Sequence, residues 1–137
     1  IIKKGKIVSV DKKNMDKISG VTFLQYDFTS AEAKEKILTI FGGKIDVIIS
    51  DMAADTTGNK SLDCIRTNLL CSEVIEFSTC ILKSRGVLVT KLFMGDDFLE
   101  VKKLAQKKFK NVVFFKPESS RNESKETYIH CDSFKSL

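Results

Sequence analysis

The stretch Lys44-Ile45-Asp46-Val47-Ile48-Ile49-Ser50-Asp51-Met52-Ala53-Ala54-Asp55 decides the fold of this chain. A short apolar run ends abruptly in Ser50-Asp51, which is typical of a buried strand that delivers a carboxylate to the carboxyl edge of a parallel sheet. Ligands of open α/β sheets bind along that edge. Asp51 could equally cap the next turn or helix, a common role for Asp after a strand. The elements on either side must decide between these two interpretations.

Apolar strands alternate with helical patterns on both sides of this stretch. We expect Ser30 to cap one helix and Gly42-Gly43 to end it. In chain order, the expected elements are strands over 6–11 and 21–27, a helix over 31–41, a strand over 45–51, a helix over 62–83, a strand over 87–93, a helix over 96–109, and strands over 111–116 and 126–131.

This alternation predicts an α/β fold with a mostly parallel sheet flanked by helices. A polar loop over 117–125, and no helix, joins the last two strands, so the last strand should run antiparallel to its neighbours. That ending resembles the Rossmann-like sheets of S-adenosylmethionine-dependent methyltransferases and separates them from dinucleotide dehydrogenases. The chain also contains no G-x-G-x-x-G, which weakens an NAD interpretation.

The composition is that of one globular domain. The 137 residues are 42% hydrophobic and 30% charged, which suits a chain that buries a single core. The apolar runs are far shorter than the roughly 18 residues of a membrane-spanning helix, so no membrane association is expected. The net charge of +5 comes from an excess of lysine. It suits a polyanionic partner, although moderate basicity is weak evidence by itself.

The cysteines and the single histidine do not form a recognisable metal site. Cys64, Cys71, Cys80 and Cys131 show neither C-x-x-C pairing nor His partners at zinc-finger spacing. We expect reduced, buried thiols, as in a cytosolic protein, rather than disulfides or metal ligands. His130 alone is too little for a His-centred site, and we expect it to be structural. No metal is therefore predicted.

Charged residues recur at or just after the ends of the expected strands: Asp11, Asp27, Asp51, Lys91 and Glu126. In order and context they resemble the FtsJ/RrmJ family of ribose 2'-O-methyltransferases, which modify large-subunit ribosomal RNA. The matching blocks run over nearly the whole chain. They are Val21-Thr22-Phe23-Leu24-Gln25-Tyr26-Asp27-Phe28, Ser50-Asp51-Met52-Ala53, Val89-Thr90-Lys91-Leu92-Phe93, and Lys116-Pro117-Glu118-Ser119-Ser120-Arg121 followed by Glu126-Thr127-Tyr128-Ile129. The last block is the most specific.

The resemblance implies a Lys-Asp-Lys-Glu catalytic tetrad, of which Asp51, Lys91 and Glu126 are three members. Lys91 is the candidate for contact with the reacting hydroxyl. To act as a base it must be neutral, which desolvation favours and the two nearby acids oppose. As a cation it could instead orient the hydroxyl or stabilise a developing oxyanion, with both acids holding it in place. The sequence leaves both roles open.

The resemblance also implies a binding site for S-adenosylmethionine. Asp11 would bind the ribose hydroxyls of this methyl donor and Asp27 the amino group of its adenine, with Asp51 bordering the same site. Independently of the family, a carboxylate at the end of a second strand can accept both hydrogen bonds of a ribose diol. Asp27 can accept from an exocyclic amine, and Phe28 beside it offers apolar surface to a purine.

Two departures from the family pattern have consequences. The family's first Lys and its glycine-rich donor loop lie upstream of the residues present here. We therefore expect a single methyltransferase domain over 1–137 that is N-terminally incomplete, lacks its first strand and helix, and is inactive by itself. Ala54 stands where the family usually carries Pro. This change could alter the path of the loop but leaves Asp51 in register.

The expected partner is ribosomal RNA or the large ribosomal subunit, bound by a monomer in the cytoplasm, with an organelle such as the mitochondrion as the alternative location. Arg121 and Lys125 could touch RNA phosphate, or they could belong to a solvated loop. Two rival interpretations remain. One is a catalytically inactive RNA-binding fragment or paralogue of the same fold, and the other is an unrelated Rossmann-like enzyme that uses a nucleotide cofactor.

Overall fold

The computed structural model describes residues 5–95, 97–116 and 126–135. The chain divides into two compact units, Ile1–Gly43 and Lys44–Leu137. Over the described residues each unit has its own sheet, with two strands in the first and four in the second. The predicted α/β class is confirmed, and its strands are shared between these two sheets.

The first unit is a parallel strand pair followed by a helix. Strands β1 (Ile7–Asp11) and β2 (Val21–Gln25) pair in parallel, with Asp11 opposite Gln25 at the carboxyl edge. Helix α1 (Ala31–Phe41) begins where the Ser30 side chain accepts a hydrogen bond from the Ala33 N–H. It ends at Gly42, whose φ of 62° lies in the left-handed region that glycine adopts without strain. The predicted helix cap and helix stop are both confirmed.

The second unit is a mixed sheet with two helices. Its elements are β3 (Ile45–Ser50), α2 (Lys60–Ile81), β4 (Leu82–Phe93), α3 (Phe98–Lys108), β5 (Phe109–Phe115) and β6 (Glu126–Phe134). The strand order is β3-β4-β6-β5. Strand β3 runs parallel to β4, and β6 runs antiparallel to both of its neighbours. The predicted antiparallel last strand is confirmed.

The boundary between α2 and β4 differs from the prediction. The helix ends at Ile81 and the strand begins at once with Leu82, five residues before the expected start. A register irregularity makes this possible, because Ile45 pairs with Leu82 while Val47 pairs with Val87. Gly86, expected at the helix exit, lies inside the strand, where an added Cβ would come within 2.5 Å of Leu82 Cγ.

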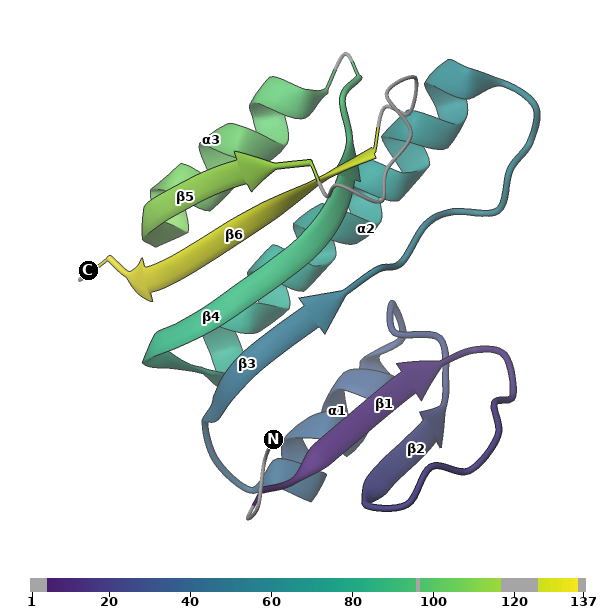
Figure 1. Ribbon diagram of the computed structural model, residues 1–137, viewed down its shortest axis with the longest axis vertical. Coiled ribbons are helices and arrows are strands. Elements are labelled where there is room, and N and C mark those ends of the chain that lie inside the picture. Colours follow the sequence, from purple (N-terminus) through teal and green to yellow (C-terminus); the bar gives the residue numbers. More distant parts are fainter. Residues whose placement is uncertain (1–4, 96, 117–125, 136–137) are drawn as a thin grey trace. The chain divides into compact units, whose positions relative to one another are not determined.

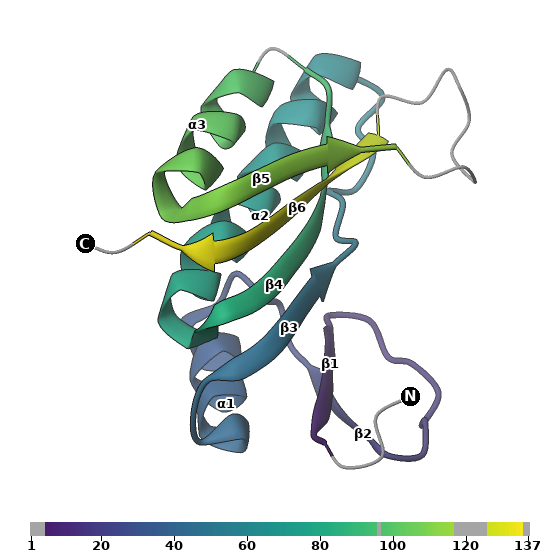
Figure 2. The same cartoon turned by 60° about the vertical axis from the view of Figure 1, so that its left-hand side comes forward.

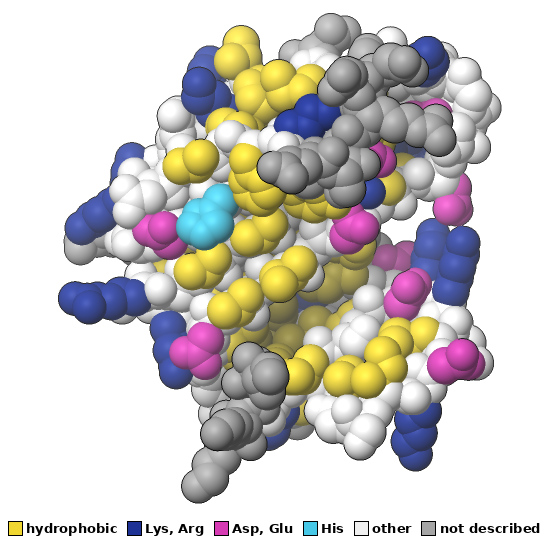
Figure 3. Space-filling model, viewed as in Figure 1, with side chains coloured by type: hydrophobic (Ala, Val, Ile, Leu, Met, Phe, Trp, Pro, Cys, Tyr) yellow, Lys and Arg dark blue, Asp and Glu magenta, His cyan; other side chains and the backbone are white. Residues whose placement is uncertain are grey.

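Helices α2 and α3 lie on the same side of this sheet, as both views show (Figures 1 and 2). Beneath them β4 buries alternate residues, Leu88, Thr90 and Leu92. Within the described part of the second unit, the opposite face instead exposes apolar side chains that gather over the strands (Figure 3): Val47, Ile49, Val113 and Phe115. The residues that alternate with the buried ones, including Lys91, belong to this open face.

The cysteines follow the prediction with one exception. All four are free thiols, and Cys64, Cys71 and Cys131 are buried. Cys80 is exposed, because it lies off the stripe of α2 that packs on the sheet through Val74, Ser78 and Ile81 and their neighbours. Among the described residues, no group of His, Cys, Asp and Glu could hold a metal ion. No helix in the described ranges is long and apolar enough to cross a membrane.

Candidate active site

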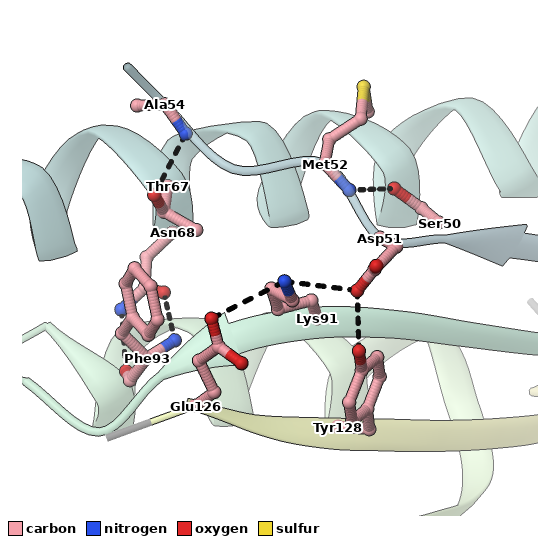
Figure 4. A network of polar contacts seen from close by, with 10 residues as sticks. All are labelled: Ser50, Asp51, Met52, Ala54, Thr67, Asn68, Lys91, Phe93, Glu126 and Tyr128. Atoms are coloured by element: carbon pink, nitrogen blue, oxygen red, sulfur yellow. Dashed lines mark hydrogen bonds and ion pairs between the residues drawn. The ribbon is translucent and has the colours of Figure 1, made fainter. Parts of the chain in front are cut away.

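Strand register in the second unit places three polar side chains in one row. Ser50 pairs with Thr90, so the next residues in each parallel strand, Asp51 and Lys91, emerge at the same level. Lys91 in turn pairs directly with Tyr128 on β6. Residues that face each other across paired strands project from the same face of a sheet. Asp51, Lys91 and Tyr128 therefore converge at one edge of the open face (Figure 4).

Lys91 is held between two carboxylates. Its Nζ lies 3.1 Å from Asp51 Oδ1 and 3.5 Å from Glu126 Oε1. The Lys91 side chain is only 11% exposed, whereas that of Asp51 is 67% exposed. The lysine is thus fixed in place by its partners, while the carboxylate beside it remains accessible to a ligand. The structure brings together the three predicted catalytic residues.

Asp51 does not cap the helix that follows it. The N-cap of α2 is Asn59, whose side chain accepts from the Leu62 N–H. In the turn after β3, Ser50 Oγ accepts from the Met52 N–H at 3.4 Å. Asp51 Oδ1 instead accepts a hydrogen bond from the Tyr128 hydroxyl in addition to its contact with Lys91. The capping interpretation is therefore wrong.

The hydrogen bonds of this cluster set its charge. Burial alone would raise the pKa of Asp51, but the hydrogen bonds from Tyr128 and Lys91, together with the positive charge of Lys91, outweigh it and lower that pKa below its ordinary value. The bond to Asp51, followed by burial, raises the pKa of Tyr128 to about 12. At neutral pH the site therefore contains an ionised Asp51 that accepts a hydrogen bond from a protonated Tyr128.

Ala54, where the sequence departs from the family's proline, donates a hydrogen bond that proline could not make. Its backbone N–H lies 3.0 Å from Thr67 Oγ1 on α2. The loop after β3 is thereby attached to the helix, and Asp51 keeps its place beside Lys91. The departure leaves the site intact, as predicted.

The first unit presents two further carboxylates at the carboxyl edge of its strand pair. Asp11 ends β1, and its carbonyl accepts from the Tyr26 N–H at 3.1 Å, next to Asp27. Asp11 Oδ1 accepts from the Lys13 N–H at 3.0 Å. Both acids are exposed. They are therefore available to a ligand that carries hydroxyl or amino donors.

Asp27 is organised by its own turn. Its Oδ1 accepts from Thr29 Oγ1 at 2.7 Å and from the Thr29 N–H at 2.9 Å. These two bonds, the side-chain one first, lower the pKa of Asp27. Both bonds are made to Oδ1, and the positive charge of Lys12 lowers the pKa of Asp27 further. Phe28 beside it is half-buried, with Lys34 Nζ lying 5.4 Å from the centre of its ring.

Some residues of the site were outside the sequence prediction, and some predicted residues are not described. Arg121 and Lys125, the predicted RNA contacts, lie outside the described residues. Tyr128 received no predicted role, although it stands two positions after Glu126 and so shares its face of the strand. Thr67 and Asn68, which bind the backbone around the site, carried no signal in the sequence beyond being polar within an apolar helix face.

Known proteins resemble this chain over most of its length. The FtsJ-like methyltransferase family matches residues 1–134. A "Ribosomal RNA large subunit methyltransferase E" from Pelagibacter ubique is 45% identical over 130 residues, which cover 95% of this chain and 64% of that protein. The protein of the same name from Rickettsia akari is 44% identical, over 90% of this chain and 55% of its own length. The chain thus spans about half to two thirds of these relatives.

Solved structures share its fold. A crystal structure named as a ribosomal RNA methyltransferase from Plasmodium falciparum matches with a TM-score of 0.82 and 29% identity, covering 96% of this chain and 73% of its own. A methyltransferase structure from Streptococcus mutans, solved in complex with SAH, is more distant, with a TM-score of 0.52 and 15% identity. It shows the fold alone. With the family match and the close relatives, these comparisons establish that the chain belongs to the FtsJ-like methyltransferase family.

Proposed function

We propose that this protein transfers a methyl group from S-adenosylmethionine to a ribose 2'-hydroxyl of large-subunit ribosomal RNA. The observation that carries the proposal is the position of Lys91, mostly buried and held between Asp51 and Glu126 at the edge of an open sheet face. The names of the related proteins support ribosomal RNA as the substrate. The family match spans residues from both units, which supports a single methyltransferase domain over 1–137.

Three residues of the first unit would hold the donor. Asp11 and Asp27 are accessible carboxylates at the ends of adjacent parallel strands, where the ligands of such sheets bind. The exposed carboxylate of Asp27 suits an amino donor, and Phe28 offers a half-buried ring to a purine. This donor set fits the hydroxyl, amino and aromatic groups of S-adenosylmethionine. When bound, S-adenosylmethionine supplies a methyl group activated by its sulfonium.

Lys91 would act on the ribose hydroxyl. Its ion pairs with Asp51 and Glu126 fix the Nζ, so that a 2'-oxygen placed against it is oriented without further ordering of the lysine. An ammonium at that position also stabilises the negative charge that develops on the 2'-oxygen as it bonds to the methyl carbon and its proton passes to water. Tyr128 holds Asp51 in turn, and the lowered pKa of Asp51 keeps this partner of Lys91 charged at neutral pH.

Contacts to the RNA remain a prediction. Arg121 and Lys125 lie outside the described residues, in the segment between β5 and β6. If they bind phosphate, RNA affinity should fall with salt by a log–log slope of about −0.7 to −0.9 per contact. Replacing both with Ala should reduce the slope accordingly, and an unchanged slope would remove them from the interface.

The test is methyl transfer itself. The full-length protein that carries this sequence is incubated with radiolabelled S-adenosylmethionine and either ribosomal RNA or large ribosomal subunits. We expect label in large-subunit RNA, at a position that resists alkaline cleavage, because alkaline hydrolysis requires a free 2'-hydroxyl. RNA binding without transfer would instead identify an inactive paralogue. If alkali still cleaves the RNA at the labelled nucleotide, its ribose 2'-hydroxyl is not the acceptor.

A further inference from the structure

Two neighbouring residues of α2 carry polar side chains into the interior. Thr67 is 0% exposed and Asn68 is 1% exposed, on a helix face that otherwise buries mostly apolar side chains. Burying such groups is unfavourable unless their hydrogen bonds are made. Elsewhere on the same helix, Ser78 and Thr79 bond to the helix's own carbonyls. Thr67 and Asn68 instead bond to other segments of the chain.

Thr67 holds the loop that follows β3. Its Oγ1 accepts the hydrogen bond from the Ala54 N–H at 3.0 Å. Ala54 lies three residues after Asp51, so this bond fixes the loop directly behind the carboxylate. The buried hydroxyl thereby satisfies a backbone donor that has left the sheet.

Asn68 holds the end of β4. Its Oδ1 accepts from the Phe93 N–H at 2.7 Å, and its Nδ2 donates to the Phe93 carbonyl at 2.9 Å. The amide therefore binds both backbone groups of one residue, as a neighbouring strand would. Nδ2 also donates to Asp97 Oδ1 at 2.8 Å, at the start of α3. Phe93 lies two residues after Lys91.

One helix therefore holds the chain behind both partners of an ion pair. Thr67 and Asn68 are consecutive residues, so the loop after Asp51 and the strand end after Lys91 are attached to adjacent points on α2 (Figure 4). We propose that Thr67 and Asn68 are positioning residues that set the 3.1 Å separation of Asp51 Oδ1 and Lys91 Nζ for methyl transfer. This inference rests on the proposed function.

The activity test compares Thr67→Val with Thr67→Ser in the full-length protein. Valine keeps the volume of threonine and loses the hydroxyl, whereas serine keeps the hydroxyl and loses a methyl group. We expect Thr67→Val to lower kcat about tenfold, since small misplacement of reacting groups is costly, and to change the KM values for donor and RNA about twofold at most. Thr67→Ser should keep the wild-type kcat. Thr79→Val, on the exposed side of α2, is the matched control for the substitution itself.

A second measurement does not depend on activity. The carboxyl carbon of Asp51 is titrated by NMR in the wild type and in Thr67→Val. If the hydrogen bond between Thr67 and Ala54 positions Asp51, its loss weakens the contact of Asp51 with Lys91. The titration midpoint of Asp51 then rises. Should Thr67→Val not fold, Asp97→Ala, which removes one acceptor of Asn68, replaces it in both measurements.

A folded Thr67→Val with wild-type kcat and an unchanged Asp51 titration midpoint would overturn the proposal that Thr67 is a positioning residue. Thr67→Ser losing as much activity as Thr67→Val would also overturn it, because the hydroxyl would then be irrelevant. If the wild-type protein transfers no methyl group to ribosomal RNA, the proposed function fails. The Asp51 titration still decides whether Thr67 positions the ion pair.

Discussion

The two units hold their carboxylates in different ways. In the second unit, Asp51 bonds to Lys91 and to Tyr128, which lies 77 positions away along the chain. In the first unit, Asp11 and Asp27 bond to residues only two positions away, Lys13 and Thr29. The Asp51 cluster exists only when three strands are in register, whereas the other acids need only their own turns. Chemistry that depends on fixed distances is thus placed where the sheet enforces them, and the proposed donor contacts are placed on local turns.

The largest effect is expected from removing the lysine at the centre of the cluster. Lys91→Ala should lower the rate of methyl transfer by about 10²–10³-fold, the usual cost of removing one group that stabilises a developing oxyanion. Lys83→Ala is the control. Lys83 lies on the same strand in an exposed ion pair with Asp46 at 2.9 Å, and its loss should leave the rate unchanged. Single-turnover kinetics measure both, and near-wild-type transfer by Lys91→Ala would remove it from the mechanism.

A smaller effect is expected from Tyr128→Phe, which removes one of the two bonds to Asp51. The folded pKa of Asp51 lies below its unfolded value of about 3.9, so its ionised form stabilises the fold above that pH. That contribution is lost as the pH falls through the folded pKa. Removing the bond raises the folded pKa and shrinks the contribution, so Tyr128→Phe should lose more stability at pH 7 than at pH 2.

Urea unfolding across this pH range measures the effect. Tyr26→Phe, which changes the other tyrosine of the chain, in the first unit, is the control. At high pH the dependence of stability on pH has the opposite direction. The pKa of Tyr128 is raised to about 12, so its stabilising contribution is present below its unfolded pKa of about 10 and disappears as the pH rises through 12. A destabilisation by Tyr128→Phe that does not vary with pH would contradict the coupling between Tyr128 and Asp51.

The smallest effect is expected from chemical labelling of the cysteine thiols in the unmutated protein. All four cysteines lie in the second unit. A thiol reagent at pH 8 should label Cys80 rapidly, because it is exposed. Burial raises the pKa of both Cys71 and Cys131 to about 12, so they should react only when this unit opens. Mass spectrometry of timed samples follows each site. Labelling of Cys71 at the rate of Cys80 would show that the interior of the second unit does not protect its thiols.

The sequence predicted the features that depend on local chemistry or on strand ends. Ser30 begins and Gly42 ends helix α1 as predicted, because helix capping needs only nearby residues. Asp51, Lys91 and Glu126 meet because they lie at or near the ends of neighbouring strands, at one edge of the sheet. The contact of Tyr128 with Asp51 depends on register, which the pattern of apolar residues did not specify.

The sequence did not predict the features that depend on how distant segments pack together. Strand β4 begins at Leu82 because an irregularity in its pairing with β3 absorbs residues that the sequence assigned to the helix exit. Thr67 and Asn68 received no predicted role. Their hydrogen bonds to Ala54 and Phe93 become visible only when the loops are in place.

The central claim is that Asp51 in the second unit serves the chemical step and Asp27 in the first unit serves donor binding. The most direct test measures kcat and KM for Asp51→Asn and Asp27→Asn side by side. Asp51→Asn removes the charge next to Lys91, so kcat should fall about 100-fold, while KM for S-adenosylmethionine changes little. Asp27→Asn weakens a contact to the donor, so KM should rise about tenfold with kcat nearly unchanged. A normal kcat in Asp51→Asn, or a loss confined to kcat in Asp27→Asn, would contradict the account.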